Sequence, residues 1–168
     1  MKRKTKILLS IILFLLISTS VFGLNLSVLV VQKNGTEKIS ESSKIFENQI
    51  LNTLFDMGHI VSNEPIALYE NYLYAHDKAI ESALNGYVDY YIEIIVEFNI
   101  EKSNNPEGIT LDNIESVEYE IKNVYSGEVL YKSKKIIPDN IYGSTEFVSF
   151  NKFACKIADN IILNIDRK

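Results

Sequence analysis

The sequence predicts an α/β (α+β) two-layer sandwich, in which amphipathic helices pack on a mixed sheet of about four or five strands. Three observations predict it. Apolar and polar residues alternate along 90–100, as in a strand with one buried face. Apolar residues recur every three or four positions over 44–57 and 144–165, as in amphipathic helices. The segment 123–133 (NVYSGEVLYKS) carries a turn signal between two alternating runs, as in a β-hairpin.

The amino-terminal 23 residues have the layout of a secretory signal peptide. Basic residues precede an apolar run over 7–17 that only Ser10 interrupts, and small residues then lead to Gly23. The apolar run is about half the roughly 20 residues that a membrane-spanning helix needs. Cleavage after Gly23 is therefore favoured over a retained membrane anchor. No cysteine follows the run to carry a lipid, so we expect a periplasmic protein that is neither a lipoprotein nor stably inserted in the membrane.

Residues 24–168 are expected to form a single α/β domain with an acidic surface. The full chain has 17 basic and 22 acidic residues, and the four basic residues of the n-region leave with the signal peptide, so the remainder has 13 against 22, or −9. Such a surface repels phosphate backbones and excludes nucleic acid as a partner. Cys155 is the only cysteine, so no internal disulfide can form. An exported protein without disulfides is typical of a bacterial envelope, where another envelope protein is the expected partner.

The first mature segment predicts a strand followed by a helix. Residues 26–32 form a continuous apolar run, typical of a strand buried on both faces. Residues 44–57 then show one apolar helical face, which includes Phe46 and Phe55. A serine at 40, 42 or 43 caps the start of this helix, and Gly58 stands where a left-handed residue would end it.

The middle of the chain predicts a short strand, short helices and then the clearest strand. Residues 59–62 predict the short strand, and Asn63-Glu64-Pro65 predicts a new helix with Asn63 as its cap. Residues 75–87 predict another helix, which Asn85-Gly86 ends. The alternating strand 90–100 follows and is expected to lie centrally in the sheet.

The hairpin and a final helix complete the predicted domain. A three-residue loop with Gly127 in the left-handed position would place Glu120 opposite Lys132 and Ile121 opposite Tyr131. A two-residue loop would oppose Ile121 to Lys132, so complementary cross-strand pairs favour the longer loop. In the final helix, Ser144 is the expected cap, and the predicted apolar stripe comprises Phe147, Phe150, Ala154, Ile157, Ile161 and Ile165.

This succession of elements resembles the small periplasmic α/β domain shared by the amino-terminal part of TolB, the curli channel protein CsgG and the penicillin-binding-protein activator LpoB. The stretches that carry the resemblance are 26–31, 46–68, 79–98 and 123–133. No propeller, lipidation cysteine, pair of membrane-spanning hairpins or Pro-rich tether accompanies them. The resemblance therefore implies an isolated module whose relatives bind other envelope proteins.

Few side chains suggest catalysis or metal binding. His59 and His76 have no metal-like partner at the spacings that metal sites use, and Cys155 lies beside the apolar stripe, as a half-buried structural thiol would. Glu93, Glu97 and Glu101 line one strand face, but residues four apart on a strand are roughly 13 Å apart, too far for a paired acid–base device. A solvated face is predicted for them. We expect no enzyme activity, no metal and no cofactor.

The most unusual local composition is tyrosine-rich. Tyr69, Tyr72 and Tyr74 form either a partner-binding surface or a core rim whose hydroxyls stay wet. We expect a non-catalytic protein-binding or scaffolding module that uses these three residues, with Gly58, Gly86 and Gly127 serving as structural turns. The alternative is a small-ligand carrier or enzyme with a pocket under the loop 102–113. The sequence predicts no oligomeric state.

Overall fold

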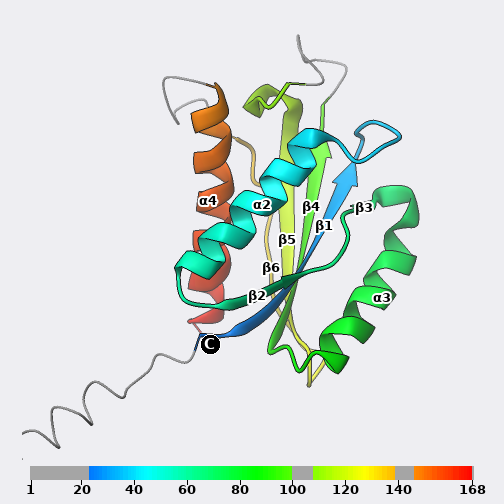
Figure 1. Cartoon of the computed structure of the whole chain (residues 1–168), viewed down its shortest axis with the longest axis vertical. Coiled ribbons are helices and arrows are strands. Elements are labelled where there is room, and N and C mark those ends of the chain that lie inside the picture. The colour runs from blue at the N-terminus through cyan, green and yellow to red at the C-terminus, as the bar shows by residue number, and fades with distance from the viewer. Residues whose placement is uncertain (1–22, 100–107, 139–145, 168) are drawn as a thin grey trace, which may run out of the picture.

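A mixed, six-stranded sheet forms the centre of the molecule (Figure 1). The computed structural model describes residues 23–99, 108–138 and 146–167, so residues 1–22 of the predicted signal peptide and Ser144 lie outside the described residues. The strand order is β2-β1-β4-β5-β6, with β3 also paired to β1. The strands are β1 Asn25–Lys33, β2 Ile60–Asn63, β3 Ala67–Leu68, β4 Tyr90–Phe98, β5 Ile114–Asn123 and β6 Val129–Lys132. The predicted fold class is confirmed, with β4 central.

Strand direction divides the sheet into a parallel and an antiparallel half. β1 runs parallel to β2, β3 and β4, which are its neighbours on both sides. β5 runs antiparallel to β4 and to β6. β1 is therefore surrounded by strands and is buried along all but its end residues, as its continuous apolar sequence predicts.

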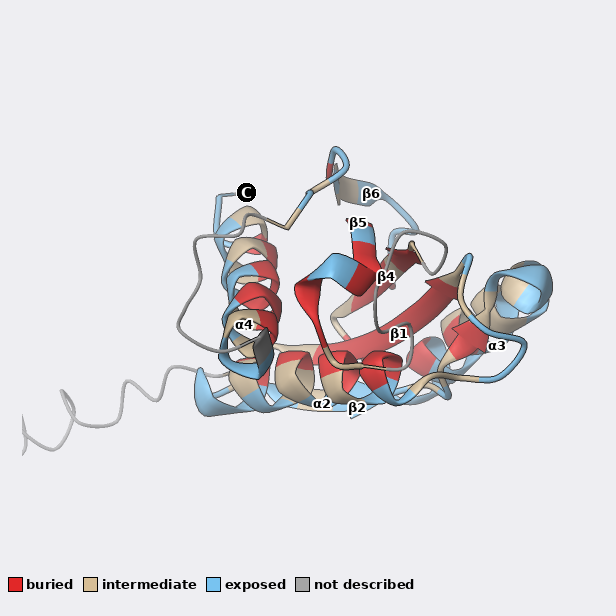
Figure 2. Cartoon of the chain, turned by 90° about the horizontal axis from the view of Figure 1, so that it is seen from above, coloured by how far each residue is buried: buried red, intermediate tan, exposed pale blue. Residues whose placement is uncertain are grey.

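Two helices cover one face of the sheet. α2 (Glu41–Asp56) and α4 (Glu146–Ile165) pack on this face and against each other (Figure 2). Phe46 of α2 meets Phe150 of α4 edge-to-face, with ring centroids 6.0 Å apart. One residue on the predicted apolar face of each helix is not buried. Phe55 of α2 is 68% exposed, and Phe147 of α4 is 51% exposed. None of the helices in the described residues combines the length and the hydrophobicity that a membrane span requires.

A third helix lies on the opposite face and covers only part of it. α3 (Tyr72–Asn85) packs through Ala79 and Ala83 on a small cluster that includes Leu29 of β1 and Tyr91 of β4. The helix stands to one side of the sheet in Figure 2, away from β6. The rest of this face holds the candidate binding site and includes side chains of β4, β5 and β6, namely Ile95, Glu97, Ser116, Glu118 and Lys132.

The predicted helix start at Asn63-Glu64-Pro65 is wrong. After β2, the chain leaves the sheet edge at Glu64 and returns as β3, where Ala67 pairs with Val31. Proline has no N–H to donate, so it interrupts a sheet edge without starting a helix here. The 3₁₀-helix η1 (Tyr69–Asn71) follows, and α3 begins only at Tyr72.

The hairpin keeps two of the predicted cross-strand pairs, but the predicted three-residue loop is wrong. The register shifts after Ile121, so that Lys122 pairs with Val129 and the loop has four residues, 124–127. Glu120 pairs with Lys132 and Ile121 with Tyr131, and the Lys132 ammonium lies 3.4 Å from the Glu120 carboxylate. Gly127 has φ +69°, a backbone conformation that favours glycine.

Of the other two predicted turn glycines, Gly58 has a positive φ and Gly86 does not. Gly58, which follows α2, has φ +91°. Gly86 follows the last residue of α3 with φ −83°. The left-handed residue at that second turn is its neighbour Tyr87, with φ +54°. The end of α3 therefore falls where the sequence predicts, although the positive φ is at the next residue.

Candidate binding site

The segment 69–78, which comprises η1 and the first two turns of α3, separates two concave surfaces. The first, called the tyrosine groove, has a volume of about 270 Å³ and lies on the uncovered part of the sheet face. The second, called the Tyr74 pocket, has a volume of about 390 Å³ and lies on the other flank of α3. The tyrosine groove is lined by Lys33, Tyr69, Tyr72, Ile95, Glu97, Ser116, Glu118 and Lys132.

A stacked pair of tyrosine rings forms one wall of the tyrosine groove. The rings of Tyr69 and Tyr72 lie 5.8 Å apart, at an interplanar angle of 13°. Tyr69 is 44% exposed, and the Lys33 ammonium lies 5.4 Å from the centre of its ring. The Tyr72 hydroxyl donates a 2.9 Å hydrogen bond to Glu93, which fixes its ring against the sheet.

Glu93 is a buried carboxylate that joins α3 to β4. It is only 6% exposed, and it accepts hydrogen bonds from Tyr72, from Tyr91 at 3.2 Å and from His76 Nδ1 at 2.6 Å. Burial, followed by the interaction with Glu93, raises the pKa of both tyrosines, so both remain hydrogen-bond donors. The predicted solvated face is wrong at Glu93, because α3 covers this residue.

Glu97 is a second buried carboxylate, at the end of the groove. It is 8% exposed, and the ammonium groups of Lys33 and Lys135 lie 2.9 and 2.8 Å from its oxygens. Ser116 Oγ and Asn34 Nδ2 also donate to it. The Lys135 and Lys33 hydrogen bonds lower the pKa of Glu97 from 4.5 to about 2. The predicted solvated face is therefore wrong here too, whereas Glu101 lies outside the described residues.

The lowered pKa of Glu97 predicts a loss of stability in acid. A carboxyl whose pKa is lower in the folded state contributes its full stability above its unfolded pKa, near 4.5, and loses it as the pH falls towards 2. We expect this loss to be about 1 to 2 kcal/mol, because Lys135 is 55% exposed and solvent screens its charge. Urea unfolding at several pH values should show it, and Glu97→Gln should remove that part of the pH dependence. An unchanged acid profile in Glu97→Gln would contradict the assignment.

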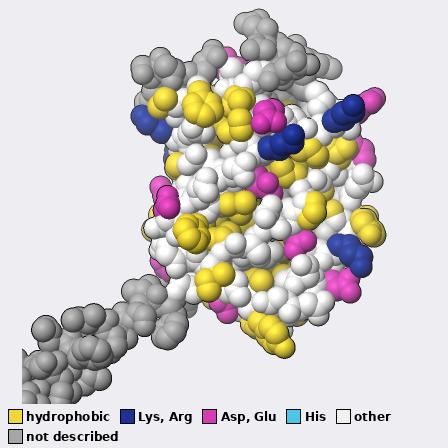
Figure 3. All heavy atoms as spheres, viewed as in Figure 1, with side chains coloured by type: hydrophobic (Ala, Val, Ile, Leu, Met, Phe, Trp, Pro, Cys, Tyr) yellow, Lys and Arg dark blue, Asp and Glu magenta, His cyan; other side chains and the backbone are white. Residues whose placement is uncertain are grey.

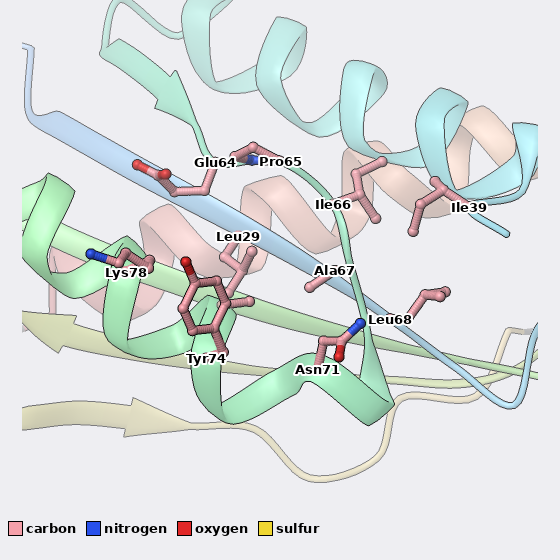
Figure 4. Close-up of a pocket in the computed structure, with 11 residues that line it drawn as sticks. Leu29, Ile39, Glu64, Pro65, Ile66, Ala67, Leu68, Asn71, Tyr74 and Lys78 are labelled. Atoms are coloured by element: carbon pink, nitrogen blue, oxygen red, sulfur yellow. The ribbon is translucent and has the colours of Figure 1, made fainter. Parts of the chain in front are cut away.

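The Tyr74 pocket lies between α3 and the connection from β2 to β3 (Figure 4). Leu29 of β1 forms its floor, and Ile39, Ile66 and Leu68 lie along its wall. The view in Figure 3 shows apolar side chains in several separate groups, with charged side chains between them.

The structure separates the three tyrosines that the sequence groups together. Tyr69 and Tyr72 line the tyrosine groove, whereas Tyr74 is 71% exposed and lines the Tyr74 pocket. His76 joins Tyr72, Tyr91 and Glu93 in one hydrogen-bonded group, called the Glu93 cluster. This cluster is not evident from the sequence, because its members come from both α3 and β4. The helical spacing of Tyr72 and His76 could have indicated that they share one face.

The remaining candidates have local structural contacts. His59 Nδ1 accepts a hydrogen bond from the Leu24 amide at 3.2 Å. Cys155 is partly buried, and Gln49 and Thr53 donate to its sulfur at 3.3 and 3.4 Å. Among the described residues, no group of three or more His, Cys, Asp or Glu side chains could hold a metal ion. The arrangement thus offers shaped surfaces with fixed aromatic and charged groups, which are the features of a binding site.

Comparison with known proteins gives a family and several structures of similar fold. A family model described as "Uncharacterised protein" matches residues 26–166. No curated protein matches the chain significantly.

Two of the solved structures are dodecamers of PelC from Paraburkholderia phytofirmans. One has 17% identity and TM-score 0.49, and the alignment covers 84% of this chain and 87% of that chain. The other is a PelC variant with 20% identity and TM-score 0.48, covering 83% and 86%. Lipoprotein GNA1162 from Neisseria meningitidis has 12% identity and TM-score 0.41, covering 84% and 99%. These structures do not confirm the expected resemblance to the TolB, CsgG and LpoB group.

Proposed function

The chain belongs to this family of uncharacterised proteins, and we propose that it is a non-catalytic binding module of the bacterial cell envelope. In this proposal, the tyrosine groove recognises another envelope protein. The periplasmic location rests on the signal-like sequence of residues 1–23, with cleavage after Gly23. The amino-terminal mass of the exported protein tests that cleavage.

The observation that carries the proposal is the stacked pair Tyr69 and Tyr72 beside the groove. Tyrosine supplies a large contact area and loses little conformational freedom on binding. Here the ring of Tyr72 is held by Glu93 and stacked on Tyr69 before any partner arrives. A surface that is ordered in advance loses less entropy when it binds, which favours affinity.

The charges of the groove support a polar protein partner. Two lysines, Lys33 and Lys132, line it together with Glu97 and Glu118. Lys33 is paired with Glu97 and Lys132 with Glu120, whereas Glu118 forms no salt bridge with any described residue. A partner that brings a basic side chain to Glu118 and an apolar one to the tyrosine rings would satisfy both features.

The hydrogen bonding of the buried carboxylates favours binding over catalysis. A general base must have a free oxygen within reach of a substrate proton. Glu93 and Glu97 instead accept three and four hydrogen bonds from the protein itself. The alternative of a ligand pocket under the loop 102–113 depends on residues 102–107, which lie outside the described residues.

Site-specific photo-crosslinking in intact cells tests the proposed function. A benzophenone amino acid at position 69 should give one dominant protein adduct, because this side chain borders the groove. The matched control is the same substitution at Tyr87, which is 77% exposed and not among the residues that line the groove. Glu118→Lys should remove the position-69 adduct. Equal adducts from both positions, or an adduct that Glu118→Lys leaves unchanged, would reject the groove as the recognition surface.

Replacing Tyr69 by Ala should weaken binding to the partner so identified by roughly thirtyfold, the effect of a typical aromatic hot spot. The free energy of unfolding should change by less than about 1 kcal/mol, since the ring is 44% exposed. Tyr72 is unsuitable for this test, because its hydroxyl also holds α3 to the sheet. Unchanged affinity for Tyr69→Ala, measured by titration calorimetry, would contradict the proposed role of the ring.

A further inference from the structure

The Tyr74 pocket has the size and lining of a small-molecule site. Its volume of about 390 Å³ falls within the roughly 300 to 1,000 Å³ of typical ligand pockets. Its floor is Leu29, which is fully buried on β1, and its walls come from three separate parts of the chain: the loop before α2, the β2–β3 connection and α3. This pocket is separate from the tyrosine groove, so a ligand bound in it would be independent of the proposed function.

The charged groups of the pocket lie at one end, and among the described residues that line it the only polar side chain towards the other end is the uncharged amide of Asn71 beside Leu68 (Figure 4). Figure 4 shows Ile39, Ile66 and Leu68 towards one end, and Glu64, the Tyr74 hydroxyl and Lys78 towards the other. A ligand that fills this space must therefore be apolar along most of its length and polar at one end. Such a molecule is an amphiphile.

The charged side chains at the polar end indicate whether the head group of the ligand is cationic or anionic. Lys78 already forms an ion pair with Glu81, at 2.8 Å, on the exposed surface of α3. Glu64 forms no salt bridge with any residue in the described part of the chain. Of the charged side chains that line this end, Glu64 is thus the one without an ion-pair partner among the described residues, which favours a cationic head group. The Tyr74 hydroxyl can accept a hydrogen bond from the same cation.

We infer that the Tyr74 pocket binds a linear aliphatic amphiphile with an ammonium head group. Its chain lies against Ile39, Ile66 and Leu68, and its ammonium group pairs with Glu64. A fatty-acid carboxylate has a chain of the same kind, but its head group would meet Glu64 with like charge. The head group therefore separates this ligand class from fatty acids.

Titration with a set of matched amphiphiles tests the inference on the full mature protein. The probes are octyl-, decyl- and dodecylamine, each below its micelle concentration, with dodecanol and dodecanoate as neutral and anionic controls. Because each buried methylene contributes about 0.8 kcal/mol, affinity should rise roughly tenfold or more for every two methylenes added. Dodecylamine should bind at one site and at least tenfold more tightly than dodecanoate. Chemical-shift changes should centre on residues that line the pocket.

Two variants and a control make the result specific to the pocket. Glu64→Gln should lower dodecylamine affinity to that of dodecanol and leave dodecanol binding unchanged. Ile39→Ser should weaken both ligands about tenfold. Glu70→Gln removes a carboxylate that is not among those lining the pocket, on neighbouring η1, and should change neither. Dodecanoate binding as tight as that of dodecylamine, no dependence on chain length, or equal losses in Glu64→Gln and Glu70→Gln would overturn the inference.

Discussion

Replacing Glu93 by Ala is expected to lower the free energy of unfolding by about 3 kcal/mol, because it leaves one buried and two partly buried donors without a partner. Tyr72, Tyr91 and His76 all direct a polar atom at this carboxylate. Tyr91 is 1% exposed, so its hydroxyl cannot turn to water without repacking. The lost stability should weaken mainly the contact between α3 and the sheet, because these hydrogen bonds join the two elements.

Chemical denaturation measures the total loss of unfolding free energy in Glu93→Ala, and hydrogen exchange shows which elements are destabilised. In Glu93→Ala, the amides of α3 should exchange faster than those of α2 relative to the wild-type protein. Glu118→Ala is the matched control: the residue lies on the same sheet face, is only half-buried and has no ion pair with a described residue, so its loss should stay below about 1 kcal/mol. Similar losses in the two variants would show that the Glu93 cluster does not hold α3.

Replacing Gln32 by Ala is expected to cost about 3 kcal/mol as well, for a different structural reason. Gln32 is 1% exposed on β1. Its amide nitrogen donates to the carbonyl oxygens of Thr36 and Lys38, at 3.1 and 3.0 Å. Its amide oxygen accepts from the Ser40 amide at 2.9 Å and the Ser43 hydroxyl at 2.7 Å.

These four hydrogen bonds hold the loop before α2 against the end of β1. Ser40 is the N-cap of α2, where its side chain accepts from the Ser43 amide. Gly35 lies so close that a Cβ on it would come within 2.5 Å of the Gln32 amide nitrogen. Gln32→Ala should therefore loosen both the loop and the first turn of α2.

A second glutamine provides the control for this prediction. Gln49 on α2 is only partly buried and donates to the sulfur of Cys155 at 3.3 Å. Sulfur is a weak acceptor, so Gln49→Ala should cost less than about 1 kcal/mol. Thermal unfolding of the two variants compares them directly. An equal melting temperature for Gln32→Ala and the wild-type protein would show that the loop is held by other contacts.

The sequence by itself determined the elements whose periodicity is regular. The alternation along Ile92, Ile94 and Val96 predicts β4 because successive residues of a strand point to opposite faces. Away from the turn, the pairing of the hairpin strands follows from charge pairs twelve residues apart along the chain, such as Glu120 and Lys132. These signals are local, so a single sequence contains them in full. They do not extend to Glu64 and Pro65, where re-pairing with the distant strand β1 decided the conformation.

Only the tertiary structure decided which polar side chains are buried and which tyrosines lie together. The same alternation that places Glu93 and Glu97 on one face of β4 cannot show that α3 and two lysines cover them. Tyr69 and Tyr72 meet across a 3₁₀-to-α-helix junction, whereas Tyr74 lies on the other flank of the same helix. The physical reason is that a charge can be buried only where hydrogen bonds or ion pairs offset its desolvation. The groups that supply these contacts come from segments distant in the sequence.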